Sequence, residues 1–363
     1  MNSRHNVCYT ICEECEFEVM FSKKIDAYLV HSPANRCYFT GIDTSFGVAL
    51  ISEQEKIFFT DFRYAGYASR TLTDFTVIAV KFSELYPSVA KELKRLDAKN
   101  VGYEESYITV AVFKEMKAEL AAFTLKPASE ILAQKRAVKT DAEIEKIENS
   151  QRIAEKALTK VIPLIKPGVT EREISAELMF EMIRLGADTP AFENIVSFGE
   201  NSADPHHHPS DKKLDKNELI LIDFGARTNG YCSDMTRTFT LGTPPEQLQV
   251  IHGIVLEAQA YALKHIKAGM TGREADSLAR EYIRANGYVK EFGHSLGHGV
   301  GVEIHEEPRL GEGSDALLVP GMVVTVEPGI YIDGLGGVRI EDLVVVQEDG
   351  VRNLTNFNKN LYL

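Results

Sequence analysis

The stretch from Leu219 to Phe239, LILIDFGARTNGYCSDMTRTF, determines how this chain is interpreted. Its apolar start is typical of a buried strand that ends at Asp223. Asn229-Gly230 is a preferred two-residue hairpin turn, and a second strand carries Asp234. With this turn, Gly225 lies opposite Asp234, and Asp223 shares the face of Gly225 two residues away. The sequence therefore predicts a hairpin with two carboxylates on one face.

A pair of acids on a hairpin has two interpretations. Two like charges this close destabilise a strand pair unless a cation or a proton lies between them. Two solvated acids on an exposed face are the simpler interpretation, and the hairpin alone favours it. Sites further along the chain favour the other interpretation, in which a cation lies between the two carboxylates.

Each of these later sites places an acid or a histidine where the backbone is constrained. His298 lies in the run GHSLGHGVG, residues 293–301, which is too rich in glycine for a helix interior and permits close approach of the backbone. Glu327 ends an apolar strand and precedes a Pro-Gly pair. Glu341 ends the segment VRIE, in which Arg339 is expected to orient its carboxylate bidentately from the same strand face. Two Asp, two Glu and one His suit two divalent cations such as manganese, cobalt or zinc.

The rest of the chain shows two patterns, separated by a polar stretch at residues 126–139. The pattern before it predicts an α/β domain, residues 1–128. After it, Thr140 and Glu143 form a capping box that begins a long helix running to Pro167-Gly168. Helices then alternate with hairpin-like strands, so an α+β domain is expected over residues 135–363. The expected strands of the first domain are residues 25–30, 47–51, 56–60 and 76–80, and the expected helices of the chain include residues 62–72, 83–96, 110–122, 170–185, 245–266 and 271–286.

Composition narrows the class of protein. The chain of 363 residues carries 40 basic and 53 acidic residues, and its formal charge of -13 disfavours nucleic acid and anionic membranes as partners. No apolar run approaches the roughly 20 residues needed to cross a bilayer, and the first twenty residues do not form a signal-type segment. We therefore expect a cytoplasmic protein.

The cysteines favour reduced thiols over a disulfide framework, because their number, five, is odd and four lie near the start of the chain. The spacing of Cys8, Cys12 and Cys15 also matches C-x3-C-x2-C, which could hold an iron–sulfur cluster. Several glutamates surround these thiols, and their negative charge opposes thiolate formation.

The five acid and histidine sites, in their order and spacing, resemble the ligand signature of the pita-bread metallopeptidases, and within that family the Xaa-Pro aminopeptidases and Xaa-Pro dipeptidases (prolidases). The resemblance covers about residues 135–363. Residues before them are similar, more loosely, to the creatinase/prolidase N-terminal domain. The resemblance implies a two-domain protein, in which an α/β creatinase/prolidase-like domain is followed by an α+β pita-bread catalytic domain, and we expect a homodimer that acts on proline-containing peptides.

The resemblance also implies a metal centre and a reaction. The expected ligands of two divalent metal ions, manganese first and cobalt or zinc as alternatives, are Asp223, Asp234, His298, Glu327 and Glu341. A hydroxide that bridges the two ions would attack the carbonyl of an Xaa-Pro bond. General peptidases handle this bond poorly, because its proline nitrogen carries no hydrogen.

Further residues receive roles in the same way. Glu327, His206 and His305 are expected to be catalytic, and His206, His294, His305 and Arg339 are expected to contact the substrate. His207 and His208 directly follow His206, so the register of the active histidine within this run stays open. If the family resemblance is set aside, a run of three histidines is usually part of a solvated loop.

Two other functions are weighed against this one. The segment GHSLG, residues 293–297, matches the G-x-S-x-G motif of serine hydrolases with Ser295 as nucleophile, but the glycines after it make a poor helix start and no acid followed by a histidine comes later. A catalytically silent binding module is expected to lack some ligands, and none is missing here. Substrate length also stays open, because Arg309 could bind a substrate carboxylate or form a surface salt bridge.

Overall fold

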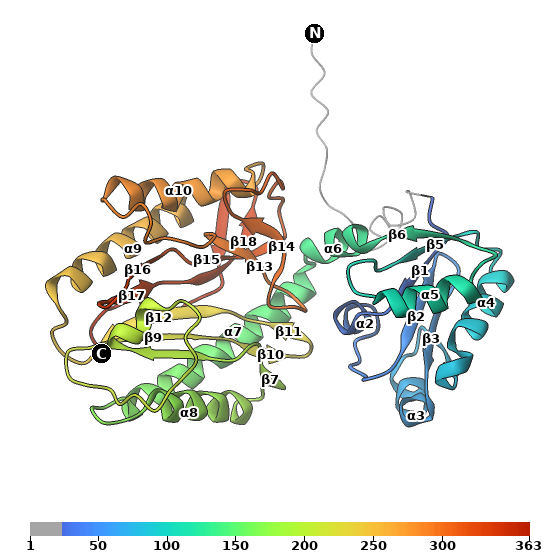
Figure 1. Ribbon diagram of the computed structural model, residues 1–363, viewed down its shortest axis with the longest axis horizontal. Coiled ribbons are helices and arrows are strands. Elements are labelled where there is room, and N and C mark those ends of the chain that lie inside the picture. The colour runs from blue at the N-terminus through green and yellow to red at the C-terminus, as the bar shows by residue number, and fades with distance from the viewer. Residues whose placement is uncertain (1–23) are drawn as a thin grey trace, which may run out of the picture. The chain divides into compact units, whose positions relative to one another are not determined.

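The computed structural model describes residues 24–363, so the interpretation of Cys8, Cys12 and Cys15 lies outside the described residues. The chain divides into two compact units, Met1–Lys135 and Arg136–Leu363 (Figure 1). Within residues 24–363, no helix combines the length and the apolar character that a membrane span requires.

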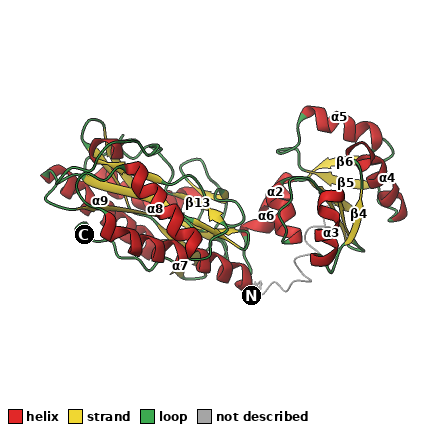
Figure 2. Ribbon diagram, turned by 90° about the horizontal axis from the view of Figure 1, so that it is seen from below, coloured by secondary structure: helices red, strands yellow, loops and turns green. Residues whose placement is uncertain are grey.

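The first unit is an α/β fold built on one mixed six-stranded sheet with the order β4-β3-β2-β1-β5-β6. In Figure 2 its strands lie between α2, α3 and α6 on one side and α4 and α5 on the other. Its elements are β1 (Ala27–Val30), α2 (Pro33–Thr40), β2 (Val48–Ser52), β3 (Lys56–Thr60), α3 (Phe62–Thr71), β4 (Thr76–Ala79), a 3-10 turn (Phe82–Glu84), α4 (Leu85–Arg95), β5 (Asn100–Tyr103), α5 (Val110–Glu119), β6 (Thr124–Pro127) and α6 (Ser129–Ala137).

Alternation along the central strands explains why both faces of this sheet are covered. In β1, Leu29 packs with α4 and α5, whereas Tyr28 and Val30 pack with α3 and α6 on the opposite face. Because successive side chains of a strand point to opposite faces, an apolar run such as β1 needs a helical layer on each side. The predicted α/β class is therefore confirmed for this unit.

The second unit is α+β, as expected. Its elements are α7 (Asp141–Val161), a 3-10 turn (Ile162–Leu164), α8 (Glu171–Arg184), β7 (Thr189–Pro190), β8 (Ile195–Phe198), a 3-10 turn (Gly199–Ala203), β9 (Leu219–Phe224), β10 (Ala226–Thr228), β11 (Tyr231–Cys232), β12 (Met235–Thr240), α9 (Glu246–His265), α10 (Gly272–Ala285), β13 (Gly297–Gly299), β14 (Glu306–Leu310), β15 (Val323–Val326), β16 (Gly329–Ile332), β17 (Gly336–Arg339), β18 (Asp342–Gln347) and β19 (Gly350–Asn353).

This unit consists of two halves, each made of a helix pair packed on a sheet. In the first half, α7 to β12, helices α7 and α8 cover the sheet β12-β9-β8 around a core that includes Leu178 and Ile222. In the second half, α9 to β19, helices α9 and α10 cover the sheet β14-β13-β15-β18-β19 around Val255 and Val344. Figure 1 shows the strands of this unit between the two helix pairs. The inner faces of the sheets are thus turned towards each other, away from the helices.

Several predicted elements differ from the observed ones. The capping box of Thr140 and Glu143 is present at the start of α7, but the helix ends at Val161 and not at Pro167. Pro163 explains the earlier end, because it has no N–H to continue the helical hydrogen bonds. The sequence analysis also did not predict the short strands β5 and β6, nor α2, nor α6, which lies in the stretch treated as a polar connection.

Candidate metal centre

The hairpin of β9 and β12 has the predicted register. Its turn residues Asn229 and Gly230 have φ angles of 52° and 82°, as a type I′ turn requires. Phe224 pairs with Met235, so Gly225 lies opposite Asp234. A Cβ atom at Gly225 would lie 1.8 Å from a backbone oxygen, which explains the glycine at this point. Asp223 and Asp234 are both buried on the face that points towards the second half.

His298 lies on β13, between β14 and β15, and its glycine neighbours are required by close backbone contacts. A Cβ atom at Gly297 would lie 2.0 Å from the carbonyl oxygen of Thr325, and one at Gly299 would lie 2.2 Å from that of Glu307. The imidazole Nδ1 contacts the carbonyl oxygen of Gly299 at 3.1 Å. Nδ1 therefore donates and Nε2 points into the site.

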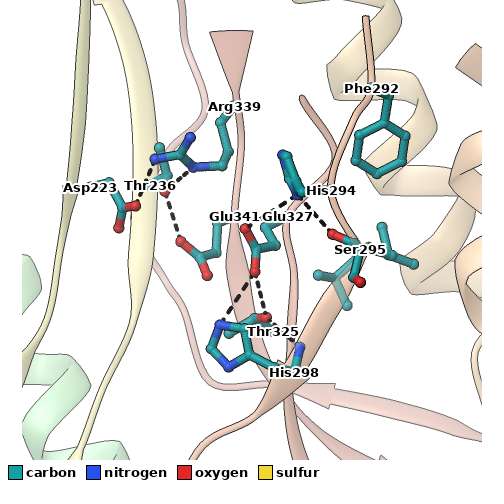
Figure 3. Close-up of polar contacts among 12 residues, drawn as sticks. Asp223, Thr236, Phe292, His294, Ser295, His298, Thr325, Glu327, Arg339 and Glu341 are labelled. Atoms are coloured by element: carbon teal, nitrogen blue, oxygen red, sulfur yellow. Dashed lines mark hydrogen bonds and ion pairs between the residues drawn. The ribbon is translucent and has the colours of Figure 1, made fainter. Parts of the chain in front are cut away.

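Two threonines that the sequence analysis missed hold the glutamates. Thr325 Oγ1 donates to Glu327 Oε1 at 3.1 Å, and Thr236 Oγ1 donates to Glu341 Oε2 at 2.7 Å (Figure 3). Thr325 lies two residues before Glu327, and Thr236 lies two residues after Asp234, each on the same strand face as that acid. This spacing of two is the signal that could have identified them.

The five predicted ligands converge from the two halves. One donor atom each from Asp234, His298 and Glu341 lies within 4.8 Å of the others. His298 Nε2 lies 3.3 Å from Glu327 Oε1 and 3.7 Å from Asp234 Oδ2. Asp223 comes from the same hairpin as Asp234, and its charge contributes to the raised pKa of Asp234.

Burial and mutual repulsion dominate the electrostatics of this cluster. Burial, followed by the charges of Glu341, Asp223 and Glu327, raises the pKa of Asp234 well above 3.8. Burial and the charges of Glu327 and Asp223 also raise the pKa of Glu341 well above 4.5. Burial would raise the pKa of Glu327 too, but the hydrogen bond and charge of His298 lower it to about 2. Without cations, the cluster therefore opposes ionisation of at least two of its carboxyl groups.

The residues present fit divalent cations. Asp223 Oδ1 and Asp234 Oδ1 are buried atoms that accept no hydrogen bond from the described residues. Oxygen ligands with a single imidazole suit hard or borderline metal ions, and such ions neutralise the charge that burial otherwise disfavours. These oxygens are therefore available as metal ligands.

Arg339 has partners that differ from the expected ones. Its Nη2 donates to Asp223 Oδ2 at 2.6 Å, its Nε donates to Thr236 Oγ1 at 3.1 Å, and its Nη1 donates to the hydroxyl of Tyr331 at 2.8 Å. The predicted bidentate pair with Glu341 is wrong, because β17 ends at Arg339 and the strand alternation does not continue to Glu341. Arg339 is 3% exposed and orients Asp223, while its predicted contact with substrate stays a prediction.

His294 belongs to the same hydrogen-bond network. Its Nδ1 donates to the carbonyl oxygen of Ser295 at 2.8 Å, so its Nε2 accepts from the Tyr331 hydroxyl at 2.9 Å. Its Nδ1 lies 4.0 Å from Glu327 Oε2, and burial lowers its pKa. Tyr331, which links Arg339 to His294, was not predicted, because the sequence gives no signal that β16 passes between them.

His305 lies in the second half, next to His298, and His206 lies in the first half. The ring of His305 lies 4.4 Å from that of His298. Burial lowers the pKa of His305, and the charges of His298 and His206 lower it further. His207 Nε2 instead hydrogen-bonds Glu171 at 2.8 Å, and the His208 side chain is 80% exposed.

Ser295 lacks the surroundings of a serine nucleophile. Its Oγ accepts a hydrogen bond from Arg309 Nε at 2.8 Å, and the strand β13 follows it where a nucleophile elbow needs a helix. Among the hydrogen bonds of residues 24–363, none joins Ser295 Oγ to a histidine.

Comparisons with known proteins agree with this geometry. Residues 145–348 match metallopeptidase family M24, and residues 18–138 match the creatinase/prolidase N-terminal domain. The chain is 40% identical to the Xaa-Pro dipeptidase of Pyrococcus furiosus, over 94% of this chain and 97% of that one. A solved Xaa-Pro dipeptidase from Bacillus anthracis has a TM-score of 0.91 and 41% identity, covering 96% of this chain and 98% of that one. An X-Pro aminopeptidase from Thermotoga maritima has a TM-score of 0.88 and 40% identity, covering 93% and 97%. The chain belongs to metallopeptidase family M24.

Proposed function

We propose that this protein is a metal-dependent exopeptidase that hydrolyses the Xaa-Pro bond at the N-terminus of a peptide or in a dipeptide. The observation that carries the proposal is the convergence of Asp234, His298 and Glu341 donor atoms within 4.8 Å, in a site where the carboxyl groups of Asp234 and Glu341 resist ionisation. Relatives named for Xaa-Pro cleavage match nearly the whole chain and support the choice of bond.

The five ligands would hold two divalent cations: Asp223, Asp234, His298, Glu327 and Glu341. When bound, such cations supply an acidified water and polarise a carbonyl group. The family resemblance assigns the uptake of the proton to Glu327, whose carboxylate the neighbouring His298 keeps ionised in the described site. His305 and His206 would stabilise charge on the substrate, and the half-buried His294, whose pKa burial lowers, would contribute a neutral ring to the substrate pocket.

The proposed metal is manganese. Four carboxylates with a single imidazole form a donor set dominated by hard oxygen atoms, which favours manganese over softer ions. Cobalt and zinc are the alternatives. Elemental analysis of protein purified without added metal, together with turnover after reconstitution with each cation, distinguishes them.

His294, Ser295 and Arg309 help to line a cavity of about 700 Å³, and we propose that this cavity determines the length of the substrate. Arg309 is exposed and forms no ion pair with the residues that the structure describes. We propose that it binds the carboxylate of a dipeptide. Arg309→Ala should then weaken hydrolysis of Gly-Pro much more than that of Ala-Pro-Ala, and equal losses on both would contradict this role.

The homodimer is proposed on the family resemblance, and the cytoplasmic location is proposed on the sequence pattern, which predicts neither a signal-type segment nor a membrane span. Sedimentation velocity and cell fractionation test these two proposals. Nucleic acid and membranes stay outside the proposal, because the formal charge is -13.

The decisive experiment uses the full chain reconstituted with manganese. Mass spectrometry should show cleavage of Gly-Pro or Ala-Pro-Ala before proline, and no cleavage of Ala-Ala-Ala. Cleavage of Ala-Ala-Ala at a similar rate would contradict the Xaa-Pro specificity. Metal-loaded protein that binds these peptides and releases no product would be a binding module.

A further inference from the structure

Glu171, the first residue of α8, has a fully buried carboxylate that accepts five hydrogen bonds from one loop. Its Oε1 accepts from the backbone N–H of Phe198 at 2.7 Å and from Asn201 Nδ2 at 2.9 Å. Its Oε2 accepts from His207 Nε2 at 2.8 Å, from the backbone N–H of Ser210 at 2.9 Å and from Ser210 Oγ at 2.6 Å. The carboxylate thus binds the loop of residues 198–210 at both ends and in the middle.

These contacts separate the three adjacent histidines. The ring of His207 is directed to Glu171, whereas the neighbouring His206 is exposed. The backbone around His206 has little freedom, because Asp204 Oδ1 accepts from the backbone N–H of His206 at 3.0 Å and Pro205 restricts the backbone between them. Anchoring His207 therefore also restrains the position of His206.

We propose that Glu171 is a positioning residue that, by binding His207, selects His206 as the histidine presented to the substrate. The inference rests on the proposed function, in which His206 contacts the substrate. In this proposal Glu171 and His207 affect turnover without contacting the substrate themselves. A buried carboxylate at the start of a helix could also serve stability alone, so the test must separate the two roles.

The first variant is Glu171→Gln, which keeps the size of the side chain. Each oxygen of Glu171 accepts from a backbone N–H, and a glutamine has only one acceptor oxygen, so one N–H must face a donor. The loop should then shift, and kcat on an Xaa-Pro peptide should fall roughly 10-fold to 100-fold, as expected for a small misplacement of a catalytic group. KM and metal content should change little.

Glu181→Gln is the matched control. Glu181 lies on the same helix and is buried, but it pairs with Arg184 and Lys160 and makes no hydrogen bond to the loop. It should leave kcat unchanged. A fall in kcat equal to that of Glu171→Gln would overturn the proposal, since the loss would then follow from weakening α8.

A double-mutant cycle tests whether Glu171 acts through His206. In the His206→Ala background, Glu171→Gln should cause no further loss of kcat. The full loss repeated in that background would overturn the inference. Wild-type kcat in His206→Ala alone would instead overturn the proposed role of His206, so the two failures are distinguishable.

Two substitutions at His207 test the inference if Glu171→Gln does not fold. His207→Ala removes the donor to Glu171 and should lower kcat, whereas His207→Gln can again donate an N–H and should restore most of it. Equal kcat in the wild type and His207→Ala would overturn the proposal.

Discussion

The two halves of the second unit share a short sequence but use it differently. Residues 166–173, KPGVTERE, and residues 267–274, KAGMTGRE, have Lys, Gly, Thr, Arg and Glu at the same places. Thr170 caps α8 and Thr271 caps α10, each through a capping box with a glutamate. The backbone also repeats: Gly168 N–H donates to Leu214 at 2.8 Å, and Gly269 N–H donates to Leu318 at 2.9 Å.

The halves diverge at the residue directly after the capping threonine. In the first half this residue is Glu171, which binds the loop that carries His206. In the second half it is Gly272, where a Cβ atom would lie 2.1 Å from the carbonyl oxygen of Arg309. The second half therefore has no room for a side chain at the equivalent position.

In the second half, a different carboxylate binds the loop that carries a histidine. Asp276 accepts from the backbone N–H of Leu296 at 2.9 Å and pairs with Arg280. Arg280 in turn donates to the carbonyl oxygens of Phe292 and His294 at 2.9 Å and 2.7 Å. In each half, a carboxylate of the second helix thus binds the loop that carries a histidine. The repeated sequence specifies the shared backbone, whereas single positions within it specify the residues of the site.

The largest effects are expected where the halves meet at the ligands. Asp234→Asn removes a proposed ligand of the first half, and Glu341→Gln removes one of the second. Either change should lower metal content and turnover by orders of magnitude, because both halves must supply carboxylates. Elemental analysis beside a peptidase assay checks this, and full turnover in a metal-free variant would exclude the metal mechanism.

The histidines of the two halves should affect turnover without affecting metal binding. His206→Ala and His305→Ala are each expected to retain both cations and to lose roughly 10² to 10⁴ in turnover, the range of acid–base or oxyanion groups. His208→Ala is the control from the same run, because its side chain is 80% exposed. An emptied metal site in His206→Ala would identify that histidine as a ligand.

Removing the cations should weaken the association of the halves in a pH-dependent way. Asp234 and Glu341 have pKa values raised well above 3.8 and 4.5 in the folded protein, so their contribution to stability is lost as pH rises through those folded values. Chelated protein should therefore lose thermal stability as the pH rises above the ordinary carboxyl values of 3.8 and 4.5, and the metal-loaded protein should lose less. At a free metal concentration about 1,000 times Kd, the gain is about 4 kcal/mol. Calorimetry at several pH values, with and without chelator, measures the difference in thermal stability between metal-loaded and chelated protein. A difference that does not change with pH would contradict the prediction.

The difference between the two halves at Gly272 can be tested by measuring the free energy of unfolding. Gly272→Ala should destabilise the protein by about 1–3 kcal/mol, since the neighbouring atom is a backbone carbonyl that cannot move aside cheaply. Gly253→Ala in α9 is the matched control: no atom lies within 4 Å of its added Cβ, and alanine favours a helix by about 0.5–1 kcal/mol. Denaturant unfolding of both variants should give shifts of opposite sign.

The smallest effect is expected at Ser295. Ser295→Ala should keep most of the peptidase activity, because the hydroxyl only accepts a hydrogen bond from Arg309. A loss of more than about 100-fold with both metals bound would favour the serine mechanism.

Local geometry accounts for what the sequence predicted and what it did not. The register of Asp223 and Asp234 was predictable because a two-residue Asn-Gly turn fixes the pairing of both strands. The partners of Arg339 were not, because strand alternation cannot be extended past the end of β17. Glu171 was missed for another reason: its partners lie far along the chain, and only the folded loop brings them to one carboxylate.

The division of ligands between two halves also bears on folding kinetics. Asp223 and Asp234 come from the first half, whereas His298, Glu327 and Glu341 come from the second. We expect the complete set of proposed ligands to form only once the halves have docked. Cations that bind this set should then stabilise the native state more than the transition state, so they should slow unfolding and change the refolding rate little. The lifetime of the folded protein against proteolysis should therefore depend on metal supply.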